Sequence, residues 1–229
     1  MNKFLVSLLL LIISNCAYAN ENELLTHKTI QNQVDDCGTK ILNANKIQEK
    51  IIFVYDAESK ENALKTVENL NKRQVVLYKD NYKFIEDENE LSAFLARDIA
   101  IAQRTYKGVF RGTLRTLQIK AAPKKFEIVA DKTAVDYMVK AGYNPLALLT
   151  FLQKTVPERR YMPFGTKNLV SKRQAIIYEY IYTKYPYFLK NNIYINNPHY
   201  QNFLLTSINN RKLLEEKIKN NSKEVLNYE

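Results

Sequence analysis

Histidine and cysteine are both scarce in this chain of 229 residues, which has two of each. The histidines, His27 and His199, are far apart in the sequence, and the cysteines are Cys16 and Cys37. A cysteine and histidine nucleophile pair is therefore not indicated. If an N-terminal leader that contains Cys16 is removed, Cys37 cannot form an intrachain disulfide, and we expect it to be a small packed residue.

Long apolar runs are also missing, except at the N-terminus. Residues 4–13 form an apolar run after Lys3, and Ala17-Tyr18-Ala19 has the small-x-small form of a signal-peptidase site. The run is shorter than the roughly 20 apolar residues that a membrane-spanning helix needs. We expect residues 1–19 to be a cleaved export signal, and the mature protein to lie in the periplasm or cell envelope without a transmembrane span.

Lipidation is the alternative fate of this leader. It would place Cys16 at the mature N-terminus, but Asn15 is a poor match for the small residue expected before a lipidated cysteine. Cleavage after Ala19 is therefore preferred over a lipoprotein.

The positive charge is spread thinly. The formal net charge is +10, yet the densest basic clusters are the dipeptides Lys124-Lys125 and Arg159-Arg160. Nucleic-acid binding requires a concentrated basic stripe or a recognisable module. We expect no nucleic-acid partner.

Hydrophobic periodicity and capping signals predict a mainly helical α+β fold. Strands are expected over residues 51–55 and 75–78, in a small sheet beside a helix over residues 87–104. Residues 34–45 are expected to be the end of a first helix, and further helices are expected over residues 123–141, 145–152, 169–184 and 209–220. We predict one domain over residues 20–190 and a C-terminal extension rich in Asn and Tyr over residues 191–229.

The helix over residues 87–104 contains two adjacent charges in an apolar middle. Asp87 and Glu90 have capping-box spacing at its start. Arg97 and Asp98 fall among apolar residues that cover most of the helix, where an unpaired charge costs several kcal/mol. They are either a structural ion pair or the remains of an active site.

Four motifs in register resemble the HtpX-like and CAAX-prenyl-protease group of zinc metallopeptidases. The family pattern acidic-Glu-Leu-Ala-x-x-Leu-Ala-His-Glu-x-x-His corresponds to residues 88–101, and Glu-x-x-Ala-Asp corresponds to residues 127–131. Ala-Gly-Tyr-Asp-Pro corresponds to residues 141–145, and Thr-His-Pro to residues 166–168. The resemblance covers most of the mature chain and implies a zincin-like metallopeptidase domain, with the small sheet beside the active-site helix.

The resemblance also implies the role of each position on that helix. The two family histidines that bind zinc correspond to Arg97 and Ile101, neither of which can donate a lone pair to a metal. The general-base position holds Asp98, a carboxylate one methylene shorter than the family glutamate.

Outside that helix, the acidic part of the family site is retained. Glu127 corresponds to the third zinc ligand, and Asp131 to the residue that orients a ligand histidine. Lys167 replaces the histidine of the later loop, and Arg173 matches the arginine six residues beyond it.

These replacements favour a protein without proteolytic activity or cofactor. We expect Arg97 to face Glu127 and Asp131, so that an arginine–carboxylate cluster replaces the metal. The preferred function is binding of unfolded or envelope polypeptides in quality control. One alternative is an active metalloendopeptidase with an atypical zinc site built on Asp98 and Glu127, and another is an unrelated helical binding module.

Overall fold

The computed structural model describes residues 26–60, 63–106, 123–155 and 169–228. The proposed leader and Lys167 lie outside these ranges, as do residues 107–122 and 156–168, for which the sequence predicts no helix or strand.

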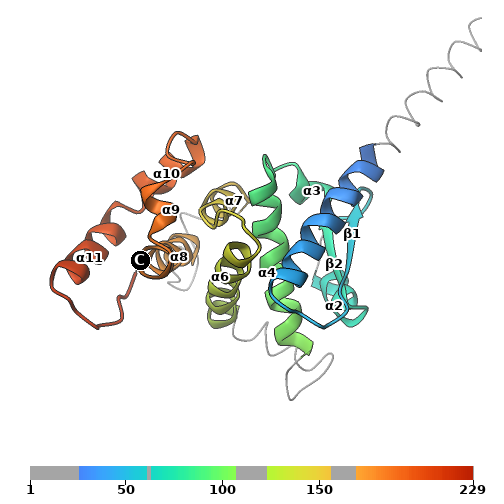
Figure 1. Cartoon of the computed structure of the whole chain (residues 1–229), viewed down its shortest axis with the longest axis horizontal. Helices are drawn as coiled ribbons and strands as arrows, with labels where there is room; N and C mark the ends of the chain where they lie inside the picture. Colours follow the sequence, from blue (N-terminus) through green and yellow to red (C-terminus); the bar gives the residue numbers. More distant parts are fainter. Residues whose placement is uncertain (1–25, 61–62, 107–122, 156–168, 229) are drawn as a thin grey trace, which may run out of the picture.

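Helix α4 (Glu88–Tyr106) lies in the middle of the molecule (Figure 1). The first helix, residues 26–44, and the sheet lie on one side of it. Helices α6 (Pro123–Lys140) and α7 (Ala147–Thr155) lie on the other side. This placement explains why α4 is buried around most of its circumference, as its sequence predicts.

The sheet consists of two parallel strands, β1 (Ile52–Asp56) and β2 (Gln74–Tyr78), with Ile52 opposite Gln74. Parallel strands need a crossover connection. Here helix α2 (Ala63–Asn71), which is not among the helices predicted from the sequence, provides it. The strands themselves match the predicted segments to within one residue at each end.

Two local expectations need correction. The sequence Lys79-Asp80-Asn81 after β2 is typical of a turn, but these residues belong to the short helix α3 (Lys79–Tyr82). Helix α7 begins at Ala147, two residues after the predicted start at Pro145, because the preceding turn has bonds of the i to i+3 type, such as Leu148 N to the Pro145 carbonyl at 3.1 Å.

Capping explains the other boundaries. The Glu90 amide donates to Asp87 Oδ1 at 2.8 Å, so Asp87 caps α4 as expected. Gly142 lies two residues after the end of α6 and has a φ of +81°, a conformation that glycine adopts without strain.

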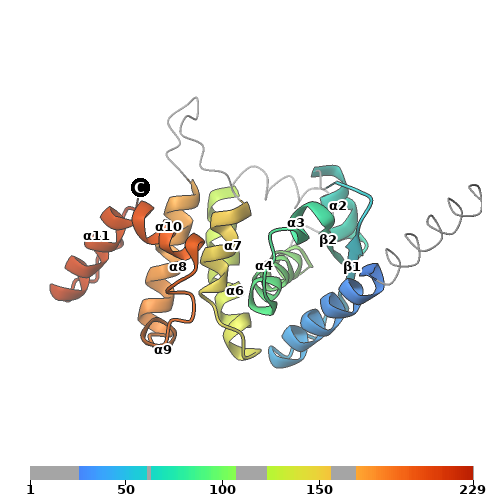
Figure 2. The same ribbon diagram turned by 90° about the horizontal axis from the view of Figure 1, so that it is seen from above.

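The C-terminal part of the chain is helical and packs on the rest. It contains the end of α8 (Leu169–Lys184), then α9 (Tyr187–Lys190), α10 (Pro198–Thr206) and α11 (Ile208–Lys219). The elements follow one another in a row, with the sheet at one side and α11 at the other (Figure 2). Tyr194, Tyr200 and Phe203 belong to the same buried core as α4 and α7.

The described residues thus form an α+β structure that is mainly helical. None of their helices is long and apolar enough to cross a membrane.

Candidate functional site

Arg97 lies in the middle of α4 and its guanidinium points to α6. Nη2 donates to Glu127 Oε2, and Nε donates to Asp131 Oδ1 at 3.2 Å. The neighbouring Asp98 is more distant, with its Oδ1 3.8 Å from Arg97 Nη1. The prediction that Arg97 faces Glu127 and Asp131 is confirmed.

A second arginine binds the same two carboxylates. Arg173 of α8 donates from Nε to Asp131 Oδ2 at 2.7 Å and from Nη2 to Asp131 Oδ1 at 2.8 Å. Its Nη1 lies 3.2 Å from Glu127 Oε2. We refer to Arg97, Glu127, Asp131 and Arg173 as the arginine–carboxylate cluster, which joins α4, α6 and α8.

The cluster balances two positive against two negative charges in a place with little water. The exposed fraction of the side chain is 1% for Asp131 and 6% for Arg173, and it is 20% for Arg97. Removal of a charge from water costs several kcal/mol unless it is paired and hydrogen-bonded. Both arginines meet this condition, because each is bonded to a carboxylate in favourable geometry.

The spacing on α6 makes this pairing possible. Glu127 and Asp131 are four residues apart, so both carboxylates lie on one face of the helix. Alanines are buried on both helices, including Ala96 and Ala100 of α4 and Ala130 of α6. Such small side chains allow a short distance between helix axes, within reach of an arginine side chain.

Pairing shifts the pKa values of the groups at the exposed side of the cluster. Burial alone would raise the pKa of Glu127, but the charges of Arg97 and Arg173 outweigh it and hold this pKa below its ordinary value of 4.5. Burial alone would lower the pKa of Arg97, but Glu127, Asp131 and Asp98 raise it above its ordinary value. Arg97 is therefore a permanent cation.

The residues present do not fit a catalytic zinc ion. Arg97 has no lone pair to donate, Ile101 is apolar, and Glu127 is bonded to both arginines. Among the described residues, no group of three or more His, Cys, Asp or Glu side chains is arranged to hold a metal.

The histidines offer no replacement ligand. The His27 ring lies 5.1 Å from the ring of Tyr55, and His199 Nε2 lies 3.9 Å from Glu86 Oε1. Glu86 precedes α4, whereas Arg97 is roughly 14 Å along the helix from its first residue at 1.5 Å per residue. Lys167 lies outside the described residues.

A second buried charge pair went unnoticed in the sequence. Glu90, 1% exposed, accepts from Lys154 Nζ at 2.5 Å, from Thr150 Oγ1 at 2.7 Å and from the Glu86 amide at 2.8 Å. The pair joins α4 to α7. The sequence singles out Glu90 only by its capping-box spacing from Asp87. That spacing does not indicate its partner Lys154, which is 64 residues away.

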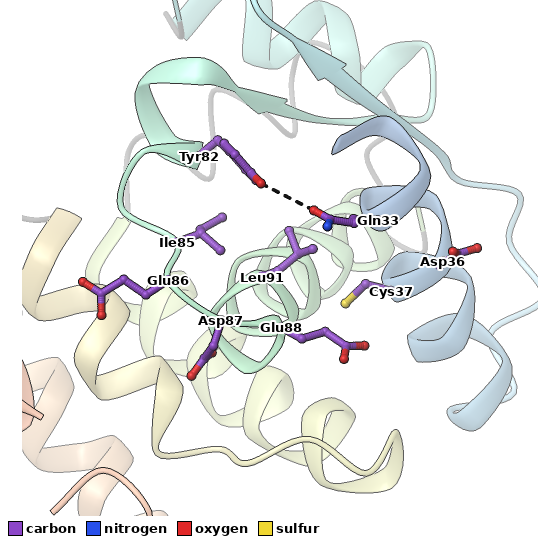
Figure 3. A pocket seen from close by; sticks show the side chains of 9 residues that line it. All are labelled: Gln33, Asp36, Cys37, Tyr82, Ile85, Glu86, Asp87, Glu88 and Leu91. Atoms are coloured by element: carbon purple, nitrogen blue, oxygen red, sulfur yellow. Dashed lines mark hydrogen bonds between the residues drawn. The ribbon is translucent and has the colours of Figure 1, made fainter. Parts of the chain in front are cut away.

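One pocket of about 420 Å³ lies at the N-terminal end of α4 (Figure 3). It is bounded by the first helix, α3 and the segment between α3 and α4. The buried thiol of Cys37 forms part of its wall, as a packed cysteine should. Burial raises the pKa of Cys37 to about 11, more than the hydrogen bond with Tyr143 lowers it, so the thiol is protonated and a poor nucleophile.

Comparison of the chain with protein-family models, with curated proteins and with solved structures found no match. The proposed relation to zinc metallopeptidases therefore rests on the four sequence motifs alone.

Proposed function

We propose that this protein is an exported, non-catalytic relative of the HtpX-like metallopeptidases that binds polypeptide chains in the cell envelope. The zincin-like fold, the export signal and the quality-control role are all parts of this proposal. It rests on the motif resemblance for the scaffold and on side-chain chemistry for the absence of proteolysis.

The single observation that carries the proposal is the position of Arg97. The motif alignment puts the first zinc ligand at this residue, and the third at Glu127. In the structure the Arg97 guanidinium donates to Glu127, so a fixed positive charge is bonded to the carboxylate that would otherwise bind the metal. In such a protein the arginine–carboxylate cluster, and not a zinc ion, joins α4 to α6.

Asp98 is compatible with this conclusion. It matches the general-base position, its side chain is 30% exposed, and its Oδ1 lies 3.8 Å from Nη1 of the Arg97 guanidinium. A general base must reach a water that is activated for attack, and in the family the zinc ion performs that activation. Among the described residues no metal-binding group of side chains lies beside Asp98, so none of them holds a zinc ion that would activate a water for it.

Metal content and proteolysis test the non-catalytic part of the proposal. The mature protein should purify without stoichiometric zinc, and casein should stay intact with or without added zinc. Stoichiometric zinc together with chelator-sensitive cleavage would instead support the active metalloendopeptidase built on Asp98 and Glu127.

Binding of an unfolded chain tests the other part. The mature protein should slow the aggregation of a reduced, unfolded client and should bind fluorescently labelled, unfolded casein. Failure of both assays with folded protein would contradict a polypeptide-binding function.

A further inference from the structure

Tyr228 is buried, although the segment that carries it has no regular structure. After α11 the chain continues to Tyr228 without a further helix or strand, and four of the five residues 223–227 are exposed. Figure 1 shows this segment running back from the end of α11 to α8. Val225 is 95% exposed, whereas Tyr228 is 3% exposed. One aromatic side chain at the far end of an exposed segment is therefore inserted into the molecule.

The place that holds Tyr228 lies against α8. The Tyr228 hydroxyl donates to Glu179 Oε2 at 2.9 Å, and Lys217 Nζ of α11 donates to the other carboxylate oxygen at 2.7 Å. One residue before the tyrosine, Asn227 Oδ1 accepts from Lys172 Nζ of α8 at 2.9 Å. Lys172 and Glu179 are seven residues apart, about two turns of the helix, so both lie on one face of α8. We refer to Lys172, Glu179 and Lys217 as the Tyr228 site.

Side chains hold residues 223–228 in this site. The last backbone–backbone hydrogen bond before them runs from the Ser222 amide to the Lys217 carbonyl at 3.0 Å, and within the described ranges residues 223–228 make none. The segment can therefore leave its site without loss of helix or strand. Its mode of attachment is that of a peptide ligand, with one buried aromatic anchor and a polar contact beside it.

We propose that the Tyr228 site also binds a tyrosine of another polypeptide, which enters when residues 223–228 leave. Burial of the ring supplies affinity, and the Glu179 carboxylate favours a side chain with a hydroxyl donor, so tyrosine is preferred over phenylalanine. The inference rests on the proposed polypeptide-binding function and adds to it the class of side chain that is recognised. It assigns recognition to α8 and α11, with residues 223–228 as a competitor attached to the protein.

An attached competitor weakens the binding of a free peptide. A segment joined to α11 by a few residues acts on the site at an effective concentration in the millimolar range. A free peptide that makes the same contacts therefore binds the wild type weakly. Tyr228→Ala removes the anchor of the segment and leaves the three residues of the Tyr228 site unchanged.

Fluorescence anisotropy with a labelled, amidated peptide of residues 221–228 tests this assignment on the full mature protein. The peptide should bind Tyr228→Ala at least about tenfold more tightly than it binds the wild type. Val225→Ala is the matched control, since Val225 is an exposed residue of the same segment, and it should keep the wild-type affinity. Tyr228→Phe keeps the ring and loses the hydroxyl bond, and it should give an intermediate affinity. Circular dichroism should show all three variants folded.

Two peptides of unrelated sequence test whether tyrosine itself is recognised. They are made of glycine and alanine and differ at one central residue, which is tyrosine or phenylalanine. The tyrosine peptide should displace the labelled peptide from Tyr228→Ala, and the phenylalanine peptide should do so about tenfold less well, because it cannot donate to Glu179.

The outcomes separate the two proposals. If unfolded casein binds but the labelled peptide has equal affinity for the wild type and Tyr228→Ala, or the two unrelated peptides compete equally, the site assignment is wrong and polypeptide binding stands. Dimers of the wild type that Tyr228→Ala does not form, detected by light scattering, would mean that the site takes a second copy of the chain instead. If neither the peptides nor unfolded casein bind to folded protein, the proposed function itself is contradicted.

Discussion

Arg97 is a cation that the middle of α4 could not hold by itself. Three carboxylates surround it, and the nearest two, Glu127 and Asp131, also bind Arg173. The net contribution of such a cluster relative to an apolar core is small, but the loss of one member leaves the remaining buried charges with one partner fewer and out of balance. Individual residues of the cluster should therefore matter more for stability than surface ion pairs do.

The Arg97→Ala variant should lose about 3 to 5 kcal/mol of unfolding free energy, because Asp131 and Glu127 each lose one cation. Urea unfolding followed by circular dichroism measures the loss. Lys72→Ala is the matched control, since Lys72 pairs with Glu68 at the surface, and its midpoint should hardly move. Equal effects of the two substitutions would show that the Arg97 pairing is unimportant for folding.

Glu127 should make stability depend on acidity. Its pKa is lower in the folded protein than its ordinary value of 4.5, so the unfolded chain binds the proton more readily. The resulting stabilisation is complete above about pH 4.5 and is lost as the pH falls through the folded pKa. In Glu127→Gln the loss of melting temperature below pH 4.5 should be smaller than in the wild type, and an unchanged slope would contradict the assignment.

At the scale of elements, buried polar bonds tie α4 to its neighbours at two levels. The arginine–carboxylate cluster joins the middle of α4 to α6 and α8, and the Glu90–Lys154 pair joins its first turn to α7. Both links connect residues at least 30 positions apart in the sequence, as with Arg97 and Glu127. Helix packing on α4 therefore depends on charge pairing as well as apolar contact.

The Glu90–Lys154 pair can be tested by removal of one charge and then of both. Lys154→Met leaves Glu90 buried without its cation and should cost about 3 kcal/mol or more. In the double variant Glu90→Gln/Lys154→Met no charge is left uncompensated, and the neutral amide oxygen can still accept from Thr150. Chemical unfolding should find the double variant more stable than Lys154→Met, and the reverse order would rule out a charge effect.

Local signals in the sequence predicted some elements and missed others for physical reasons. Asn144 and Gly142 identify the turn between α6 and α7, because their capping roles depend only on neighbouring residues. The same signal precedes α10, where Asn197 accepts from the amide of His199 at 2.8 Å, yet that helix was not predicted. The parallel pairing of β1 and β2 was not predicted either, since it depends on a connecting helix.

The candidate site likewise has a part that the sequence predicted and a part that it did not. Arg97, Glu127, Asp131 and Arg173 were singled out by motif positions, and the structure brings all four together. The pocket at the start of α4 gave no such signal, because its wall combines residues from the first helix with residues some 50 positions later. Proximity of that kind follows from packing and cannot be inferred from local periodicity.

At the scale of the whole molecule, the C-terminal 39 residues are not a detached tail. The Tyr194 hydroxyl donates to Asp87 at the start of α4, and Tyr228 donates to Glu179 of α8 at 2.9 Å. Phe203 is completely buried against this part of the core. The segment expected as an extension thus shares its core with the domain over residues 20–190.

Two substitutions in α10 test that integration. Phe203→Ala should cost about 3 to 5 kcal/mol, because it opens a cavity in the shared core. Leu205→Ala, two residues further on, changes a side chain that is 67% exposed and should change stability by less than about 0.5 kcal/mol. A single unfolding transition shifted only by Phe203→Ala is the expected result, whereas an unshifted main transition in both variants would mean that the C-terminal helices fold separately.

We propose that Arg97 occupies the position of a metal ligand on a metallopeptidase-like scaffold. Zinc binding by the double variant Arg97→His/Ile101→His tests it most directly, since histidines four residues apart on α4 would join Glu127 as ligands. We expect about one tightly bound zinc per chain and a zinc-dependent rise in melting temperature that is lost when Glu127→Gln is added, with no rise in the wild type. A folded double variant that binds no zinc, or binds it equally well without Glu127, would contradict the claim.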